Sequence, residues 1–465
     1  MSGPMALEPG GTERDTLALR LAGPPARRDD HTLALRLPRR GPDLEAVSRL
    51  AADLADRVGP AVHPYEVAAL LEAEGLTADE IRQRYGHTGL FSLAAALYEQ
   101  VPRTFPEPPP TADPWRPDTV RSLLRGVLFA LPGLAYLLTA PLWHPGRHTA
   151  ALITAGLVSW AWGQGLGHRA HLRLATGRRE AARTLLTGAP LGAALATACA
   201  VPLAGASGPV LAAAAAQSLY LAAAGVLLVL ARERLLLAAL TPLIAGAAVL
   251  PWWEPGTAVR TGLPLLALLA TLAGTGHALR GALATPAAAG GARPRLRWSL
   301  PYGLFGLAAG VLVLLEGRRD PYAVIVLTVS MGPAEWLLYR YRGLSVAALR
   351  ATATPAGFLL RSTAVLGGCL LAYVLPLLPA AHLTGAAPAP LLLLAATLWT
   401  ALLLQAFGAA WPPAVICLAA AATAGAVALL HLPPGRAALP LCCGAAVPAL
   451  VACALRLLGR PARHV

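Results

Sequence analysis

Ionisable side chains are rare in the apolar part of this chain, and Glu335 is the strongest candidate for chemistry among them. It follows Gly332-Pro333 and precedes Arg340 by five residues, which is about 7–8 Å along a helix at about 1.5 Å per residue. Charged groups are costly inside a bilayer and are commonly functional there. A carboxylate at this position could act as a gate, or could couple the movement of a proton or a substrate.

Arg361 is the expected partner of Glu335. It lies about six residues into the next apolar stretch, which enters from the same side, so antiparallel helices would place the two charges at one depth. The Gly332-Pro333 pair would loosen the helix before Glu335 and free backbone carbonyls, as in the broken helices of transporters. The alternative is a static ion pair, or an arginine that extends toward the headgroups.

Uncharged polar residues within the apolar stretches form a second group of candidates. Gln217 and His277 are the two singled out here as transport or gating candidates, together with Glu335, Arg361 and Pro333. Such residues could line a polar cavity, or they could only bond neighbouring helices. The histidine pair His168 and His171 has no further metal ligands nearby in the sequence, so no metal or cofactor site is expected.

The residues that would position these groups are strongly apolar. The composition is 56% hydrophobic and 13% charged, with a mean hydropathy of +0.57, whereas soluble proteins carry about 25% charged residues. Roughly twelve apolar stretches have the length of about 17–25 residues that spans a hydrocarbon core of about 30 Å. We therefore predict an all-α fold: a polytopic membrane bundle of about 12 transmembrane helices with a small N-terminal helical cytosolic region. The predicted stretches are 122–142, 149–167, 184–204, 208–231, 235–253, 261–281, 299–316, 321–339, 355–378, 387–409, 411–431 and 437–457.

Arginines alternate between the connecting loops. The loops after the even-numbered stretches and the C-terminal tail carry 17 arginines, while the opposite loops carry five. By the positive-inside rule, this pattern predicts a multi-pass protein of the inner (plasma) membrane with both termini cytoplasmic. The long loop 282–298 separates two possible six-helix halves, 120–281 and 299–458, a division that is common among secondary transporters.

The chain before the first apolar stretch differs in charge. Residues 1–118 contain 13 arginines and 18 acidic residues, a net charge of −5, whereas residues 119–465 have a net charge of +19. Because the only soluble region is acidic, no nucleic-acid partner is expected. We predict a disordered segment over 1–41, a small helical module over 42–102 and a Pro-rich linker over 103–119, followed by the transmembrane domain 120–465.

The helical module has readable helix signals. An amphipathic pattern covers Leu44–Val58, Pro64 suits a first helical turn, and Thr77–Glu80 has the capping-box pattern. Phe91 and Leu97 belong to a fourth apolar face. The module could bind a protein partner, or it could fold on itself as a cytosolic cap.

Missing residue types narrow the function. The chain has no lysine, which excludes Schiff-base, Ser–Lys and Walker-A chemistry, and it has no GxSxG or HExxH pattern. An enzyme is therefore not expected. Arginine as the sole strong base, with abundant Ala, Gly, Pro and Leu, indicates GC-rich coding of the kind found in actinobacteria.

Three sequence segments carry a resemblance to a known class: His63-Pro64-Tyr65-Glu66-Val67, Tyr85-Gly86-His87, and the stretch Glu335–Arg342. With about twelve spans after the acidic prefix, the chain resembles actinobacterial envelope proteins. Their layout is similar to that of polysaccharide flippases of the oligosaccharide-lipid exporter superfamily. The resemblance implies a transporter that moves an amphiphilic precursor, such as a lipid-linked glycan, across the bilayer. The alternative is a non-catalytic scaffold of an envelope polysaccharide assembly complex, in which residues 42–102 bind a protein partner.

Overall fold

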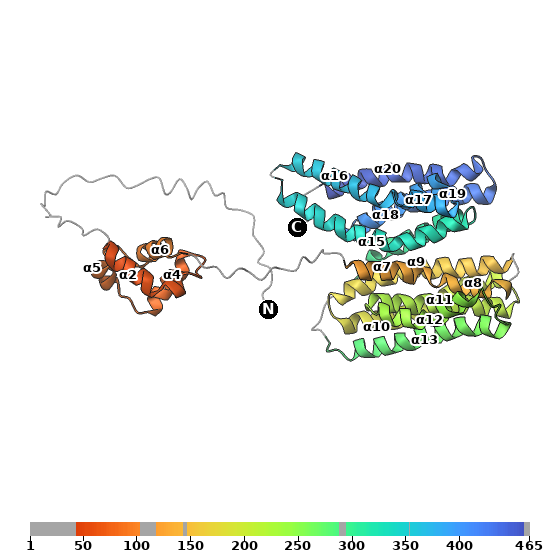
Figure 1. Ribbon diagram of the computed structural model, residues 1–465, viewed down its shortest axis with the longest axis horizontal. Coiled ribbons are helices and arrows are strands. Elements are labelled where there is room, and N and C mark those ends of the chain that lie inside the picture. Colours follow the sequence, from red (N-terminus) through yellow and green to blue (C-terminus); the bar gives the residue numbers. More distant parts are fainter. Residues whose placement is uncertain (1–42, 103–117, 143–146, 288–293, 353, 460–465) are drawn as a thin grey trace. The chain divides into compact units, whose positions relative to one another are not determined.

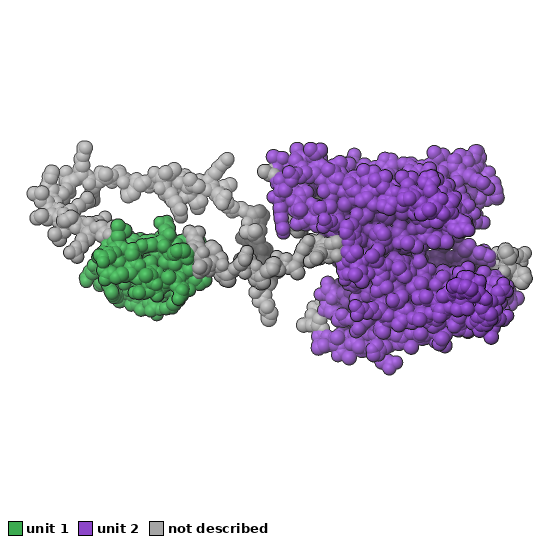
Figure 2. Space-filling model, viewed as in Figure 1, with its two compact units in different colours: residues 1–112 green, residues 113–465 purple. Residues whose placement is uncertain are grey.

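The computed structural model describes residues 43–102, 118–142, 147–287, 294–352 and 354–459. The predicted disordered segment 1–41 and most of the linker 103–119 lie outside these residues. The chain divides into two compact units, residues 1–112 and residues 113–465 (Figures 1 and 2). Each unit is helical, and the described residues contain no β-strand.

The first unit is a small helical module with its own core. Val67, Leu71, Leu93 and Leu97 are fully buried in it. Thr77 caps its helix as the sequence predicted, because its Oγ1 accepts a hydrogen bond from the backbone N–H three residues later, at 3.3 Å. The helices are α2 (Leu44–Asp53), α3 (Ala55–Val58), α4 (Pro64–Ala73), α5 (Ala78–Arg84) and α6 (Leu90–Gln100).

Two residues that were assigned to the apolar faces of this module are exposed instead. Leu44 and Phe91 each stand at the first turn of a helix, where the side chain reaches past the core. Phe91 packs edge-on against the exposed ring of Tyr65, with 5.6 Å between the ring centroids. The apolar pattern therefore predicted the helices correctly, but it did not predict that these first-turn side chains are exposed.

The second unit begins with six helical segments of the first half. Span one is formed by two short helices that meet at Pro132, and the other segments are single helices. The helices are α7 (Thr119–Ala130), α8 (Gly133–Thr139), α9 (Arg147–Leu174), α10 (Arg178–Ala204), α11 (Gly208–Val229), α12 (Glu233–Val249) and α13 (Thr257–Leu283).

The second half has the same number of segments. Its third span is again formed by two helices, which meet at Pro376. The helices are α14 (Leu300–Gly317), α15 (Pro321–Arg350), α16 (Pro355–Val374), α17 (Leu377–Thr384), α18 (Pro388–Ala406), α19 (Trp411–Leu430) and α20 (Ala438–Leu458).

Ten helical segments of the described chain are long and apolar enough to cross a membrane, which confirms the predicted class of an all-α polytopic membrane bundle. The predicted number of spans was twelve. The two stretches outside the ten are α12, which at 17 residues is the shortest, and α9, whose 28 residues include a polar last turn with His171 and Arg173. Both pack within the bundle beside the other helices.

Each half has its own buried core. The large core of the second half gathers residues of α14 to α20 around the buried Trp399. The first half holds two smaller clusters, one around Leu227 and Leu240 and one formed by alanines with Val210. Separate cores mean that apolar burial stabilises each half mainly within itself.

Two helix crossings join the halves. The first helix of one half packs against the second helix of the other, so that α7 contacts α15 and α14 contacts α9. In Figure 1 these helices lie between the two bundles, and Figure 2 shows a furrow between the halves at the right of the view. The halves are thus two bodies in contact through a limited set of helices.

Candidate functional site

The α7–α15 crossing depends on two glycines that let the backbones meet. A Cβ atom on Gly126 would lie 2.8 Å from the backbone nitrogen of Gly332, and a Cβ on Gly332 would lie 2.8 Å from the carbonyl oxygen of Ser122. Contacts of this kind are typical of closely packed membrane helices. Side chains one turn away, on the facing sides of the two helices, therefore come within reach of the other helix.

Pro333 stands directly after this contact. It lies inside α15, which continues as a single helix from Pro321 to Arg350. A proline removes the hydrogen bond to the carbonyl four residues earlier, here that of Val329. That carbonyl oxygen lies 3.3 Å from where a Cβ on Gly126 would be. The glycine-proline pair thus opens one side of α15 to the close approach of α7.

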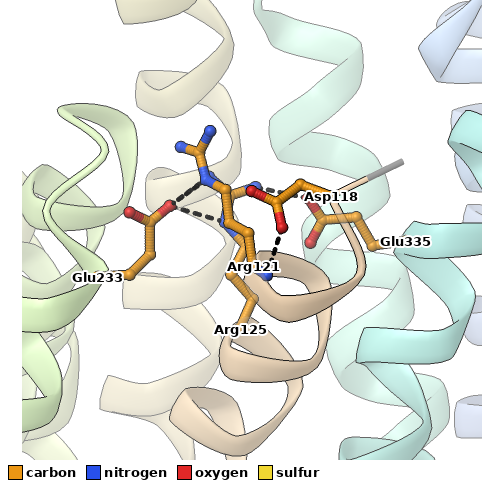
Figure 3. Close-up of polar contacts among 5 residues, drawn as sticks. All are labelled: Asp118, Arg121, Arg125, Glu233 and Glu335. Carbon is orange, nitrogen blue, oxygen red and sulfur yellow. Dashed lines mark hydrogen bonds and ion pairs between the residues drawn. The ribbon is translucent and has the colours of Figure 1, made fainter. Parts of the chain in front are cut away.

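One turn further along α15, Glu335 accepts a hydrogen bond from Arg125 of α7, with 2.6 Å between Nη1 and Oε1 (Figure 3). The expected Glu335–Arg361 ion pair is therefore wrong. Arg361 is exposed on α16, and no ion pair is found for it among the described residues. The antiparallel neighbour that supplies the arginine comes from the other half, a pairing that adjacency in sequence does not predict.

Arg125 contacts a second carboxylate within its own half. Its Nε and Nη2 lie 3.1 and 3.0 Å from Oε1 of Glu233, the first residue of α12. Arg121, one turn before Arg125 on α7, also donates to Glu233, with 2.8 Å from Nε to Oε1. We refer to Arg121, Arg125, Glu233 and Glu335 as the charge cluster. It contains two positive and two negative groups.

Local structure holds the charge cluster in place. Asp118 caps α7 by accepting a hydrogen bond from the backbone N–H of Arg121 at 3.0 Å, as Figure 3 shows. Glu233 opens α12, where a carboxylate is favoured by the helix dipole. Trp336, next to Glu335, donates from Nε1 to the hydroxyl of Thr119 at 3.2 Å. The arginines thus approach from the first two turns of a capped helix, between the two acids.

Burial is uneven across the charge cluster. The Glu233 side chain is 8% exposed, those of Arg125 and Glu335 are 22% and 24% exposed, and that of Arg121 is 44% exposed. Removing one member of a buried ion pair is costly because it leaves the other charge without compensation. Arg125 is the only residue of the charge cluster with a carboxylate partner in each half, so the ion pairing between the halves depends on it among the described residues.

The two other sequence candidates lie elsewhere. Gln217 of α11 donates to the carbonyl oxygen of Leu152 in α9 at 3.2 Å, within the first half. His277 is exposed on α13. Neither belongs to the charge cluster. Among the candidates, only Glu335 and the neighbouring Pro333 lie at the contact between the halves.

Three residues of the charge cluster were missed: Arg121, Arg125 and Glu233. The available signal was the spacing of Arg121 and Arg125, four residues apart at the start of the first span, which places both on one helix face. Glu233 stands between Arg232 and Arg234 and looks like part of a basic loop. Only the folded chain shows that its side chain turns into the bundle.

The second crossing, α9 with α14, is built differently. Gly306 packs against α9, because its Cβ would lie 2.7 Å from Cγ of Gln164 and 3.2 Å from Cα of Ala161. At one end the ring of His168 stacks on Tyr302, with centroids 3.7 Å apart, and its Nδ1 lies 3.1 Å from the hydroxyl of Ser299. No ion pair joins α9 to α14 in the described residues.

Comparisons with known proteins give little further information. No protein-family profile and no curated protein matches the chain. One similar solved structure is described as the crystal structure of MATE in complex with Br-NRF. It covers 74% of this chain and 98% of its own, with 13% sequence identity and a TM-score of 0.42. A TM-score this low gives the likeness no weight for the function of this chain.

Proposed function

We propose that the protein is an integral membrane transporter of the flippase-like kind, which moves an amphiphilic cell-envelope precursor such as a lipid-linked glycan. The observation that carries the proposal is Arg125, which pairs with Glu233 in its own half and with Glu335 in the other. An ion pair across the contact between two separately packed halves is suited to a contact that forms and breaks. No catalytic role is proposed.

The position of the charge cluster supports a gate at one end of the bundle. It lies near the start of α7 and the start of α12, on the side where the arginine-rich loops connect the helices. By the positive-inside rule, that side faces the cytoplasm of a plasma-membrane protein. When α7 and α15 separate, Glu233 keeps Arg121 and Arg125 as partners while Glu335 loses Arg125. Opening this end would therefore expose the carboxylate of Glu335 toward the space between the halves.

The nature of the cargo rests on sequence. The layout that resembles polysaccharide flippases favours a lipid-linked sugar over a small soluble solute. A cargo with a lipid tail can remain partly in the bilayer while its polar head passes between two halves. Alternating access by rigid movement of two repeats is a common mechanism for such bundles.

The test uses a deletion strain and purified protein. Loss of the protein should cause lipid-linked precursor to accumulate and surface polysaccharide to fall, with rescue by wild type but not by Arg125→Gln or Glu335→Gln. In liposomes, wild type should move a fluorescent lipid-linked sugar between leaflets. Unchanged glycans in the deletion strain, together with no movement of the probe, would refute the proposal.

A cross-link tests the gate directly. Cysteines at Thr119 and Trp336, in a background without native cysteines, would be joined by a short bifunctional thiol reagent across the α7–α15 contact. The linked protein should be inactive, and a reducible linker should restore activity on cleavage. A matched pair within one half, Leu152→Cys with Gln217→Cys, should leave transport active when linked.

The second candidate is a membrane scaffold for an envelope polysaccharide assembly complex. The observation that favours it is the exposed aromatic pair of the N-terminal module, Tyr65 and Phe91, which are 67% and 64% exposed while touching each other. Aromatic side chains of this kind are common anchors in protein interfaces. A stoichiometric partner in pull-downs that is lost with Tyr65→Ala and Phe91→Ala, together with normal rescue by Glu335→Gln, would favour the scaffold.

A further inference from the structure

A small cavity lies inside the first half, away from the charge cluster. It has a volume of about 40 Å³ and lies between α9, α10 and α11, and it is partly open, since Gly163 in its wall is exposed. Its walls are apolar apart from two serines, Ser159 of α9 and Ser218 of α11. Trp162 forms part of the α9 wall, and its indole nitrogen is already used, since it donates to the carbonyl oxygen of Gly188 at 2.8 Å.

The two serine hydroxyls have no partner. Ser218 is fully buried and Ser159 is 8% exposed, and the Oγ atom of each is shielded without a hydrogen bond. Several threonine hydroxyls of this chain donate to the carbonyl four residues earlier, as Thr197 and Thr271 do at 2.8 and 2.7 Å. The serines at the cavity do not follow this pattern. A buried hydroxyl without a partner is costly, so its ligand is to be sought in the space beside it.

The residue types that line the cavity limit which ligand can bind there. A metal cation would require several oxygen ligands and usually a carboxylate, and no carboxylate lines the cavity. A purely apolar ligand would leave both hydroxyls unpaired. A cavity needs at least about 10–15 Å³ to hold a water molecule, and the volume of about 40 Å³ exceeds this requirement.

We infer that this cavity is a binding site for ordered water, which bridges Ser159 of α9 and Ser218 of α11. The water lies behind α9, since the opposite face of that helix carries Ala161 and Gln164, which contact α14 of the other half. The bridge fixes the helix that carries the second crossing. The inference does not depend on the proposed transport function.

Radiolytic footprinting of the full chain in lipid nanodiscs tests the site. Hydroxyl radicals formed from bound water oxidise the side chains next to it, even where bulk water has no access. Trp162 should be oxidised at millisecond exposures. The internal control is Trp160 of the same helix, which is half-buried like Trp162 and does not line the cavity. When the protein is transferred into ¹⁸O-water shortly before exposure, Trp162 should incorporate ¹⁸O more slowly than surface residues do. The reason is that buried water exchanges slowly with bulk water.

Two variants separate water from empty space. Ser159→Ala with Ser218→Ala enlarges the cavity but removes its hydrogen-bond partners, and apolar cavities of this kind remain dry. Oxidation of Trp162 should therefore fall severalfold although the space has grown. Gly225→Val fills the space instead, since a Cβ at Gly225 meets no atom within 4 Å, and it should lower the same signal.

The opposite results would overturn the inference. Oxidation of Trp162 in the wild type no greater than that of Trp160 would mean that the cavity is dry and that the hydroxyls turn toward helix carbonyls. Oxidation that persists unchanged in both variants would mean that the radicals come from another source. Thermal midpoints of the variants near that of the wild type would show that the comparison is made on folded protein.

Discussion

In each of the two crossings that join the halves, the first helix of one half packs against the second helix of the other. The side chains that reinforce the two crossings differ in their chemistry. At α7–α15, a glycine contact is reinforced by the pairing of Arg125 with Glu335. At α9–α14, a glycine contact is reinforced by the neutral stack of His168 on Tyr302. An ion pair at partial exposure weakens with salt and with loss of either charge, whereas a stack of rings depends on shape. We infer that the first crossing is the one that opens and the second is the pivot.

The largest expected effect on stability comes from a larger side chain at the α7–α15 crossing. Gly332→Val would place a Cβ 2.8 Å from the Ser122 carbonyl oxygen and 3.3 Å from Cα of Leu123. These are backbone atoms, which cannot rotate away as a side chain can. We therefore expect the free energy of unfolding to fall by about 3 kcal/mol or more, at the upper end of overpacking costs. The thermal midpoint in one detergent measures it. Gly368→Val is the matched control, because nothing lies within 4 Å of its Cβ. Equal losses in the two variants would contradict the close approach.

The second effect is the loss of the shared arginine. Arg125→Ala leaves Glu335 without an ion-pair partner in the described residues and leaves Glu233 with Arg121 alone. We expect a loss of about 2–4 kcal/mol, below the full cost of an orphaned buried charge because both side chains are partly exposed. Double replacement with Glu335→Gln should recover part of the loss. A double variant as unstable as the sum of the two single variants would show that the charges do not interact.

Comparison of sequence and structure separates what pattern can predict from what it cannot. Hydropathy and length predicted the helices because each span must satisfy its own backbone in lipid, and this holds whichever neighbours the span has. Glu335 was recognised because a carboxylate is conspicuous in an apolar stretch. Its partner was assigned to Arg361, the nearest arginine on the next helix, whereas the structure pairs it with Arg125, which lies 210 positions earlier in the chain.

The same reasoning accounts for Glu233. Its carboxylate stands among loop arginines, where sequence alone predicts solvent. Its side chain is 8% exposed because α12 begins at that residue and packs near α7. The packing between the halves decides which spans become neighbours. A single sequence does not show directly which spans pack together.

The third prediction concerns the neutral crossing. His168→Ala removes the stack on Tyr302 and the hydrogen bond to Ser299, and we expect a loss of about 1–2 kcal/mol from the ring contact and the bond together. This loss of unfolding free energy should be the same at low and high salt concentration. The loss caused by Arg125→Ala should become smaller as the salt concentration rises. Salt dependence of equal size in the two variants would remove the distinction between the crossings.

A smaller effect is expected at the exposed end of the charge cluster. Arg121 pairs with Glu233, but its side chain is 44% exposed and Glu233 keeps Arg125 when it is removed. Arg121→Ala should therefore cost no more than about 1 kcal/mol. It should also leave the Arg125–Glu335 link intact, so cross-linking between positions 119 and 336 should proceed as in the parent protein. A loss as large as that of Arg125→Ala would mean that Arg121 joins the halves as well.

The smallest effect is expected at Arg361, and it decides between the two assignments of the partner of Glu335. Arg361 is exposed on α16 and has no ion pair among the described residues, so Arg361→Ala should change the free energy of unfolding by less than about 0.5 kcal/mol. In a double-mutant cycle, Glu335→Gln should couple with Arg125→Ala and not with Arg361→Ala, because coupling energies arise between residues in contact. Coupling of Glu335 with Arg361 alone would restore the partner inferred from sequence and would remove the link between the halves on which the proposed gate rests.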